Sequence, residues 1–258
     1  MPYRVDKRLT EIIERIECPH CGAPISIQPG ELVATCKYCG FTSVIETGKA
    51  FEYEHSLILN KLETKRTIEI LTGWMQNSFM APKDLAKKAK ITETTLVYVP
   101  FWIVSLKAST HYKGVFERIS PPVTKEGDIN KDYAWLVLAR KASYFPTSSY
   151  KTPLEAKIPF DFTKVQPEAK VLNSEIDVDE AVSVAQEEIE NLHSFLSKQD
   201  VDKLVEFSTS FEVKTTTYLH APIWFLSYQY RNSEYRAYVD GSTGDVIKCD
   251  LPVAQSNF

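Results

Sequence analysis

The chain has 258 residues, of which 43% are hydrophobic and 25% charged, and its formal net charge is −4. These values are typical of a soluble globular protein, and the net charge excludes a strong overall positive field that would attract nucleic acid. The longest apolar run, residues 96–104, is far shorter than the about 20 residues of a transmembrane helix. We therefore expect a soluble, cytoplasmic protein without a membrane segment.

The chain begins with a segment, residues 1–17, that we expect to form a short amphipathic helix over 5–16. Apolar side chains recur there at helical spacing: Val5, Leu9, Ile12, Ile13 and Ile16. A helix of this length is marginal alone and needs a surface to pack against. That surface is either the protein's own body or a partner.

Two Cys-x-x-Cys pairs, Cys18 with Cys21 and Cys36 with Cys39, are separated by fourteen residues. Zinc takes four ligands in tetrahedral geometry, and thiolates are among its preferred ligands. A two-residue gap lets one tight turn present two sulfurs to one ion. A glycine follows each pair, where it can adopt the positive φ needed to leave such a turn. The pattern predicts one Zn²⁺ held by these four cysteines.

Two short apolar runs around Pro29 and Gly30 lie between the pairs and predict a hairpin, so we expect a zinc ribbon over residues 18–50. Two disulfides are the alternative reading, but only five cysteines occur and no signal peptide is recognisable. Four thiolates leave no position open for water, which favours a structural metal over a catalytic one. We expect neither His20 nor the isolated Cys249 to be a ligand.

Residues 51–143 are predicted to form a first α+β unit. The expected elements are an extended segment at 51–62, a helix near 64–79, a short basic helix opened by Pro82, strands at 96–106 and 108–117, a loop or flap at 118–132, and a strand at 135–139. The longer helix would bury Ile68, Leu71, Met75 and Phe79.

Residues 144–172 contain four prolines and are predicted to be an irregular linker. A second unit follows at 173–258. It begins with the clearest helix of the chain, 178–196, which Asp177 and Glu180 start in the manner of a capping box and whose buried face would extend to Phe195. A short helix at 200–207 and strands at 211–217, 222–231 and 234–240 complete the unit, with a polar turn at 240–245 leading into a hairpin.

The two units share a repeated pattern, Pro-x-Trp-x-x-Ser, at residues 100–105 and 222–227. Each copy follows a long and a short helix and precedes a second strand. The fold class predicted is α+β, with two related helix-plus-antiparallel-sheet units after the ribbon. Pro100 and Pro222 should begin their strands or lie at bulges, because proline cannot donate within a central ladder. We expect Trp102 and Trp224 to be core side chains rather than stacking platforms for bases.

Residues 18–117 resemble a prokaryotic family of transcription-factor-B-type zinc-ribbon proteins that are often labelled as relatives of a primosomal helicase. The resemblance rests on the ribbon, on the Leu-Ala-rich segment 80–91 and on Tyr98 to Trp102. It implies a zinc-binding protein without helicase activity, because no phosphate-binding Gly-x-x-x-x-Gly-Lys loop is present. Residues 235–247 resemble a short strand-turn-strand motif of peptidase-propeptide-like domains.

Charge is distributed unevenly along the chain. Segment 61–90 has seven basic and three acidic residues, whereas 173–212 has eleven acidic residues and two lysines. Such blocks suggest two faces with different partners, although solvated helix faces are often charged. The basic helix supplies the candidate nucleic-acid contacts, with three of them on one helical face: Lys83, Lys87, Lys88 and Lys90.

Three functions remain open from the sequence. The first is a non-enzymatic binding factor for a ribonucleoprotein or nucleic-acid machine, such as the ribosome or the transcription apparatus. The second is a protein–protein assembly or adaptor factor without nucleic-acid contact. The third, an enzyme, is the least favoured, because the five histidines lack metal-pair spacing and no nucleophile elbow is present.

Overall fold

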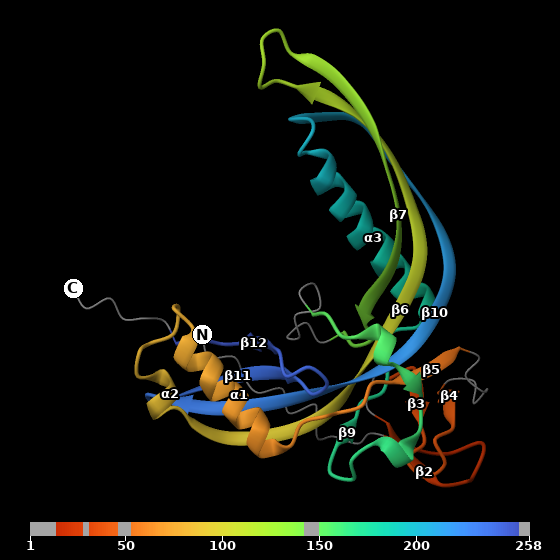
Figure 1. The fold of residues 1–258 in the computed structure, drawn as a ribbon. Coiled ribbons are helices and arrows are strands. Elements are labelled where there is room, and N and C mark those ends of the chain that lie inside the picture. The colour runs from red at the N-terminus through yellow and green to blue at the C-terminus, as the bar shows by residue number, and fades with distance from the viewer. Residues whose placement is uncertain (1–13, 28–30, 46–52, 142–149, 253–258) are drawn as a thin grey trace.

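A computed structural model describes residues 14–27, 31–45, 53–141 and 150–252 (Figure 1). Over these residues the body is dominated by one eight-stranded sheet, which is strongly curved and carries α1 and α3 on its concave side. The sheet therefore forms two arms, with a helix packed on each. Among the described residues, no helix combines the length and the apolar character needed to cross a membrane.

Two very long strands, β6 (Lys90–Phe116) and β10 (Lys203–Tyr230), pair antiparallel along almost their whole length and form the centre of the sheet. The remaining strands of the sheet are β5 (Glu54–Leu57), β7 (Val123–Leu138), β8 (Ile158–Pro159), β9 (Lys170–Val171), β11 (Ser233–Asp240) and β12 (Val246–Cys249). β7 extends the sheet beside β6, and β11 and then β12 extend it beside β10.

In the part of the chain that the structure describes, the helices are α1 (Thr64–Asn77), the single turn α2 (Leu85–Lys88) and α3 (Val178–Ser197), with two 3-10 turns at Leu154–Ala156 and Phe162–Lys164. α3 begins as its sequence predicts, since the Asp177 carboxylate accepts the backbone N–H of Glu180 at 2.8 Å. The predicted helices 64–79 and 178–196 are therefore confirmed to within two residues.

Side chains alternate between the two faces of the long strands, as the period of a strand requires. Even-numbered residues of β6 face the helices: Leu96 and Tyr98 pack in the cluster under α1, and Trp102 and Val104 in the cluster under α3. Odd-numbered residues such as Phe101 form a third cluster on the opposite face. We call the two ends of the sheet the α1 half (α1, α2, 90–98, 222–230, β11 and β12) and the α3 half (α3, β7, 102–116 and 203–218).

The prediction of two separate helix-plus-sheet units is wrong in one respect, because strands of both units pair within a single sheet. The expected strands 96–106 and 108–117 are one strand, since Ala108 is fully buried and continues the alternation. The strands 211–217 and 222–231 are likewise joined within β10. The short helix expected at 200–207 is also wrong, because β10 starts at Lys203. Each long strand was predicted as two shorter ones, although no turn residue and no break in the alternation of side chains separates the two parts.

The loop or flap expected at 118–132 is mostly strand, since β7 starts at Val123. The strand was not predicted because its sequence is rich in charged residues, which lie on a solvent-exposed face of the sheet. There, Lys107 of β6 lies opposite Asp132 of β7 on one side and Glu212 of β10 on the other. Cross-strand pairs of opposite charge stabilise such a face without apolar residues, so hydrophobic alternation was not a sufficient signal.

Pro100 and Pro222 lie inside their strands, contrary to the prediction that they begin strands or mark bulges. The carbonyl of Pro100 accepts the N–H of Ala139, and the carbonyl of Pro222 accepts the N–H of Gly241. In an antiparallel strand the N–H and C=O of one residue point to the same side. Each proline nitrogen therefore points away from the β6–β10 ladder. Pro100 lies in the gap between β7 and β9 along β6, and Pro222 lies in the gap between β5 and β11 along β10. No ladder bond is lost.

Three further expectations need correction. Residues 14–17 form strand β1, so the helix predicted over 5–16 does not include them, and its first part, 5–13, lies outside the described residues. Phe79 follows the end of α1 and is 95% exposed, and Phe195 is 64% exposed. α2 starts at Leu85 and not at Pro82. The described part of the predicted linker, from residue 150 on, contains only one-turn helices and two-residue strands.

Candidate metal centre

The cysteine pairs lie in two small hairpins at the start of the chain. The first hairpin pairs β1 (Glu14–Glu17) with β2 (Pro24–Ile27), and the second pairs β3 (Val33–Thr35) with β4 (Thr42–Val44). The hairpin predicted between the cysteine pairs is therefore wrong: the tight turns are the Cys-x-x-Cys segments themselves. β2 and β3 belong to different hairpins, and residues 28–30 between them lie outside the described part.

The two Cys-x-x-Cys turns have nearly the same backbone geometry. The N–H of Gly22 donates to the carbonyl of Cys18 at 2.8 Å, and the N–H of Gly40 donates to the carbonyl of Cys36 at the same distance. Both glycines have positive φ, 72° and 76°, so the expected reason for a glycine after each pair is confirmed. Each turn thus directs two thiols toward one point.

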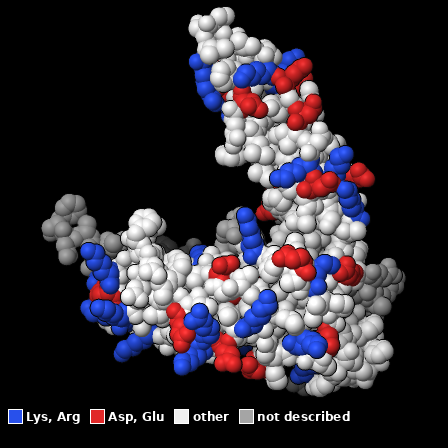
Figure 2. Space-filling view, viewed as in Figure 1, with Lys and Arg blue, Asp and Glu red and all other residues white. Residues whose placement is uncertain are grey.

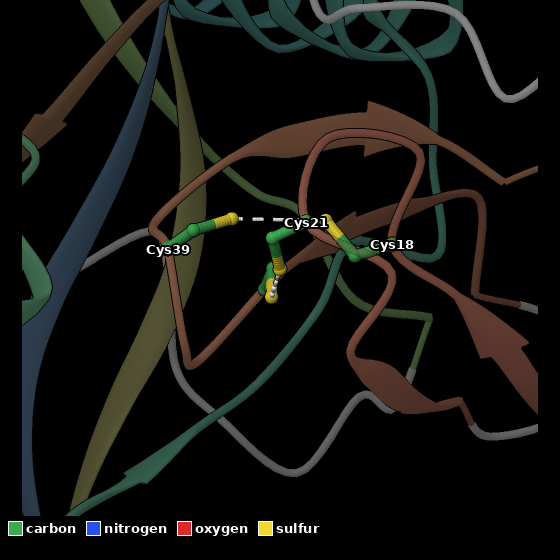
Figure 3. Close-up of side chains that lie close together, drawn as sticks. Cys18, Cys21 and Cys39 are labelled. Carbon is green, nitrogen blue, oxygen red and sulfur yellow. Dashed lines mark hydrogen bonds between the residues drawn. The ribbon is translucent and has the colours of Figure 1, made fainter.

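The four sulfurs of Cys18, Cys21, Cys36 and Cys39 all lie within 4.8 Å of one another. Figure 3 shows the labelled side chains approaching from the two turns, with Sγ–Sγ distances of 3.7 Å for Cys18 and Cys39 and 3.8 Å for Cys21 and Cys36. Tetrahedral Zn–S bonds of about 2.3 Å place sulfurs about 3.8 Å apart. The cysteines are free thiols, far from the bonding distance of a disulfide. The group is therefore positioned to hold a metal ion.

Ionisation of the thiols depends on their surroundings. Burial opposes ionisation of Cys18, but hydrogen bonds from the backbone N–H groups of Cys21 and His20 outweigh it and lower its pKa to about 7. Desolvation within the cluster, together with the neighbouring thiols, raises the pKa of Cys39 to about 12. Four thiolates at these distances would repel one another. The positive charge of a coordinated cation offsets that repulsion and so favours deprotonation of its ligands.

A buried ion cluster joins the ribbon to the α3 half of the body. The guanidinium of Arg140 contacts Glu31 at 3.0 Å and Glu175 at 2.9 Å, and the Arg140 and Glu31 side chains are only 8% and 3% exposed. Asn173 completes the junction by donating to Glu31 and accepting from the N–H of Thr35. Because this charge is desolvated, loss of one member would leave the others without compensation.

A second junction is a chain of hydrogen bonds from the ribbon to the centre of the sheet. His220 Nε2 donates to the carbonyl of Leu172 at 2.8 Å, so its Nδ1 accepts from His55 Nε2, also at 2.8 Å. His55 Nδ1 then accepts from the hydroxyl of Thr42 in β4 at 3.0 Å. Desolvation lowers the pKa of His220 to about 4 and that of His55 to about 2. Both rings are therefore neutral. The sequence offered no signal for this junction, because the residues are up to 178 positions apart.

The candidate nucleic-acid lysines lie at the far end of the α1 half. Basic side chains gather at the left end of the lower arm in Figure 2, where Figure 1 places α2. Only two of these lysines belong to the one-turn helix, so the predicted common helical face does not exist. All four are exposed, and they are Lys83, Lys87, Lys88 and Lys90.

One acidic side chain, Asp84, lies within this basic segment. It accepts from the hydroxyl of Tyr230 at 2.7 Å and forms ion pairs with Lys88 at 2.9 Å and Arg231 at 3.6 Å. The hydrogen bond from Lys88 holds the pKa of Asp84 well below its usual range. Leu85 is fully buried and anchors the segment to the core under α1. Arg231 joins the basic surface from the β10–β11 turn, which the sequence analysis had missed.

No family model, curated protein or solved structure matches the chain.

Proposed function

We propose that the chain is a non-enzymatic zinc-ribbon factor that binds a ribonucleoprotein or nucleic-acid machine, such as the ribosome or the transcription apparatus. The observation that supports this is the exposed basic surface at the α2 end, which carries four lysines and Arg231 and in which the carboxylate of Asp84 is ion-paired with Lys88 and Arg231. Phosphate contacts by such residues supply sequence-independent affinity.

We propose zinc as the metal of the ribbon and a structural role for it. The cluster is all-sulfur and closed, which suits Zn²⁺ and leaves no position for a substrate. Elemental analysis of the purified protein should give one zinc per chain. Cys36→Ser should release the metal and unfold the ribbon, while far-UV circular dichroism of the β-rich body changes little. A metal content near zero, or cysteines oxidised in pairs, would rule out the zinc assignment.

The proposed function is tested by affinity purification of the full chain from its native host, with and without nuclease. The double variant Lys87→Glu, Lys88→Glu should lose its nucleic-acid-containing partner and keep its thermal stability. It should also reduce the slope of log K against log salt concentration by about one for each phosphate contact removed. The matched control, Lys198→Glu with Lys203→Glu, reverses two exposed lysines near the end of α3 and should bind normally.

A protein–protein adaptor remains the alternative, and α3 is the observation in its favour. Its 20 residues include five carboxylates and no lysine or arginine. Asp179, Glu180, Glu187 and Glu190 are exposed. Retention of the partner after nuclease treatment, with no effect of the lysine substitutions at low or high salt, would favour the adaptor and reject nucleic-acid binding.

We also propose that the two halves are copies of one helix–strand–strand unit. The axis relating them would pass through the directly paired residues Val99 and Ala221, which differ by the same 122 positions as Trp102 and Trp224. Superposition of residues 64–138 on 178–240 tests this. Placement of the two tryptophans at different depths or on opposite faces of the superposed strands would reject it.

A further inference from the structure

The connection between α1 and α2 places two bulky apolar side chains in solvent. α1 ends at Asn77, and the N–H of Ala81 donates to the carbonyl of Ser78 at 3.2 Å, which closes a β-turn. Phe79 and Met80 occupy its two central positions and are 95% and 65% exposed. Phe79 is the most exposed of the large apolar side chains that the structure describes. The turn is short and held at both ends by the structure around it.

Folding does not account for this exposure. The buried face of α1 is made by Leu71 and Met75, which pack against the strands of the α1 half. Phe79 lies beyond the last turn of the helix and gains nothing from that core. A single exposed apolar residue is ordinary, but two consecutive ones at the apex of a turn present a defined contact point.

The chain on the C-terminal side of this turn is basic. Within eleven residues of Phe79 there are four exposed lysines and one acid, Asp84, whose charge is offset by Lys88 and Arg231. An exposed aromatic ring and several exposed cations in one short segment are a combination that binds single-stranded nucleic acids, because bases stack on the ring and phosphates contact the cations.

We propose that this surface, Phe79 to Lys90 with Arg231, binds single-stranded RNA or DNA and that Phe79 stacks on an unpaired base. The inference rests on the proposed function and specifies its ligand. A duplex is disfavoured because the faces of its bases are already covered by their neighbours. A lipid surface is disfavoured because membrane-bound helices bury a whole apolar face, whereas one ring and one Met side chain match the area of a single base.

The test uses the full zinc-loaded chain and fluorescence anisotropy with three probes: a 12-nucleotide oligo-U, a 12-nucleotide oligo-dT and a 12-base-pair duplex. Wild type should prefer the single strands. Phe79→Ala should weaken their binding by about 5- to 150-fold, the range found for loss of one stacked base. Phe79→Trp should bind as tightly as wild type, because a ring is retained. The RNA and DNA probes decide which sugar the site prefers.

Phe79→Leu separates stacking from a general apolar contact, because it keeps an apolar side chain and removes the ring. It should behave like Phe79→Ala. The matched control is Phe195→Ala, an exposed ring on acidic α3, which should not change binding. All variants should unfold at the wild-type temperature, since both rings are exposed.

Several outcomes would overturn the inference. One is that Phe79→Leu or Phe79→Ala binds the single strands with wild-type affinity. Another is that wild type binds the duplex as tightly as the single strands. A third is that wild type binds vesicles containing phosphatidylserine and not the oligonucleotides. If Phe79 variants bind normally while Lys87→Glu, Lys88→Glu does not, stacking is rejected and the proposed function stands. If no probe binds wild type and the native partner survives nuclease, both are rejected.

Discussion

The α1 half and the α3 half each bury a tryptophan beneath a helix, but their surfaces carry opposite charge. In each, a Trp two positions after a mid-strand Pro lies buried beneath a helix, and its indole N–H finds a partner: Trp102 donates to the carbonyl of Ile176 and Trp224 to Asn60 Oδ1. The surface of the α1 half ends in exposed lysines, whereas α3 is acidic. The comparison teaches that two similar buried patterns can carry surfaces of opposite charge.

The cores also differ in polarity. Under α3, His193 is fully buried and contacts the hydroxyls of Thr110 at 2.6 Å and Tyr133 at 2.8 Å. Burial lowers the pKa of His193, so the ring is neutral in this network. Under α1 the corresponding space is filled by apolar side chains such as Leu71 and Met75. The ribbon, moreover, is joined by its ion cluster to the α3 half.

The largest effect on stability is expected from replacing each tryptophan by alanine. Trp102→Ala and Trp224→Ala should each lower the free energy of unfolding by about 3–5 kcal/mol, because each leaves a cavity in a packed core. Urea denaturation of the single variants measures both values, with Phe195→Ala as the exposed control. A cost below about 1 kcal/mol for either one would show that the two halves are not equivalent in packing.

Breaking the ribbon junction should loosen the ribbon where it meets the body and leave the α1 half unchanged. Arg140→Met should destabilise the protein by about 3 kcal/mol, because the buried carboxylates of Glu31 and Glu175 lose their cation. Hydrogen exchange should accelerate at the amides of Leu32 and Thr35 and stay slow in β11. The control is the adjacent Lys141→Met, whose exposed ion pair with Glu180 contributes about 0–1 kcal/mol. Equal effects of the two substitutions would contradict a buried, stabilising junction.

The histidine pair lies where the two halves meet and should make stability depend on pH. The pKa values of His220 and His55, about 4 and about 2, lie below the 6.5 of an unfolded histidine, so the unfolded chain binds more protons between these limits. Stability is therefore unaffected above pH 6.5 and falls as pH decreases below it, by up to about 1.4 kcal/mol per pH unit for each histidine.

Urea denaturation at pH 7.5, 6.5, 5.5 and 5.0 measures this slope. The variant His220→Gln should reduce it by about one proton relative to wild type. Because wild type and His220→Gln share the same cysteine cluster, proton uptake by the thiols cancels in the comparison. An identical slope in His220→Gln would contradict a neutral buried pair.

The smallest expected effect concerns the two exposed rings. Phe79→Ser and Phe195→Ser should each change the free energy of unfolding by no more than about 0.5 kcal/mol, because neither ring is part of a core. Thermal denaturation followed by circular dichroism is sufficient. A loss above about 1 kcal/mol in one of them would show that this ring packs in solution, and for Phe79 it would remove the premise of base stacking.

The sequence alone determined those features that depend on near neighbours. The spacing of Cys18, Cys21, Cys36 and Cys39 predicted the cluster, because two short turns place the sulfurs with little help from the body. Apolar residues at helical spacing predicted α1 and α3, and the Asp177 cap located the start of α3. The burial of Trp102 and Trp224 followed from the apolar residues around each.

Tertiary structure decided the rest, because it depends on partners distant in the chain. Strand length is set by pairing, so β6 and β10 each continue where the sequence analysis divided them into two strands, and charged β7 is a strand because it pairs with β6 along its whole length. The contacts of Arg140 and His220 join segments more than 100 residues apart. Whether Phe79 is buried or exposed was decided by where α1 ends, which helical spacing does not reveal.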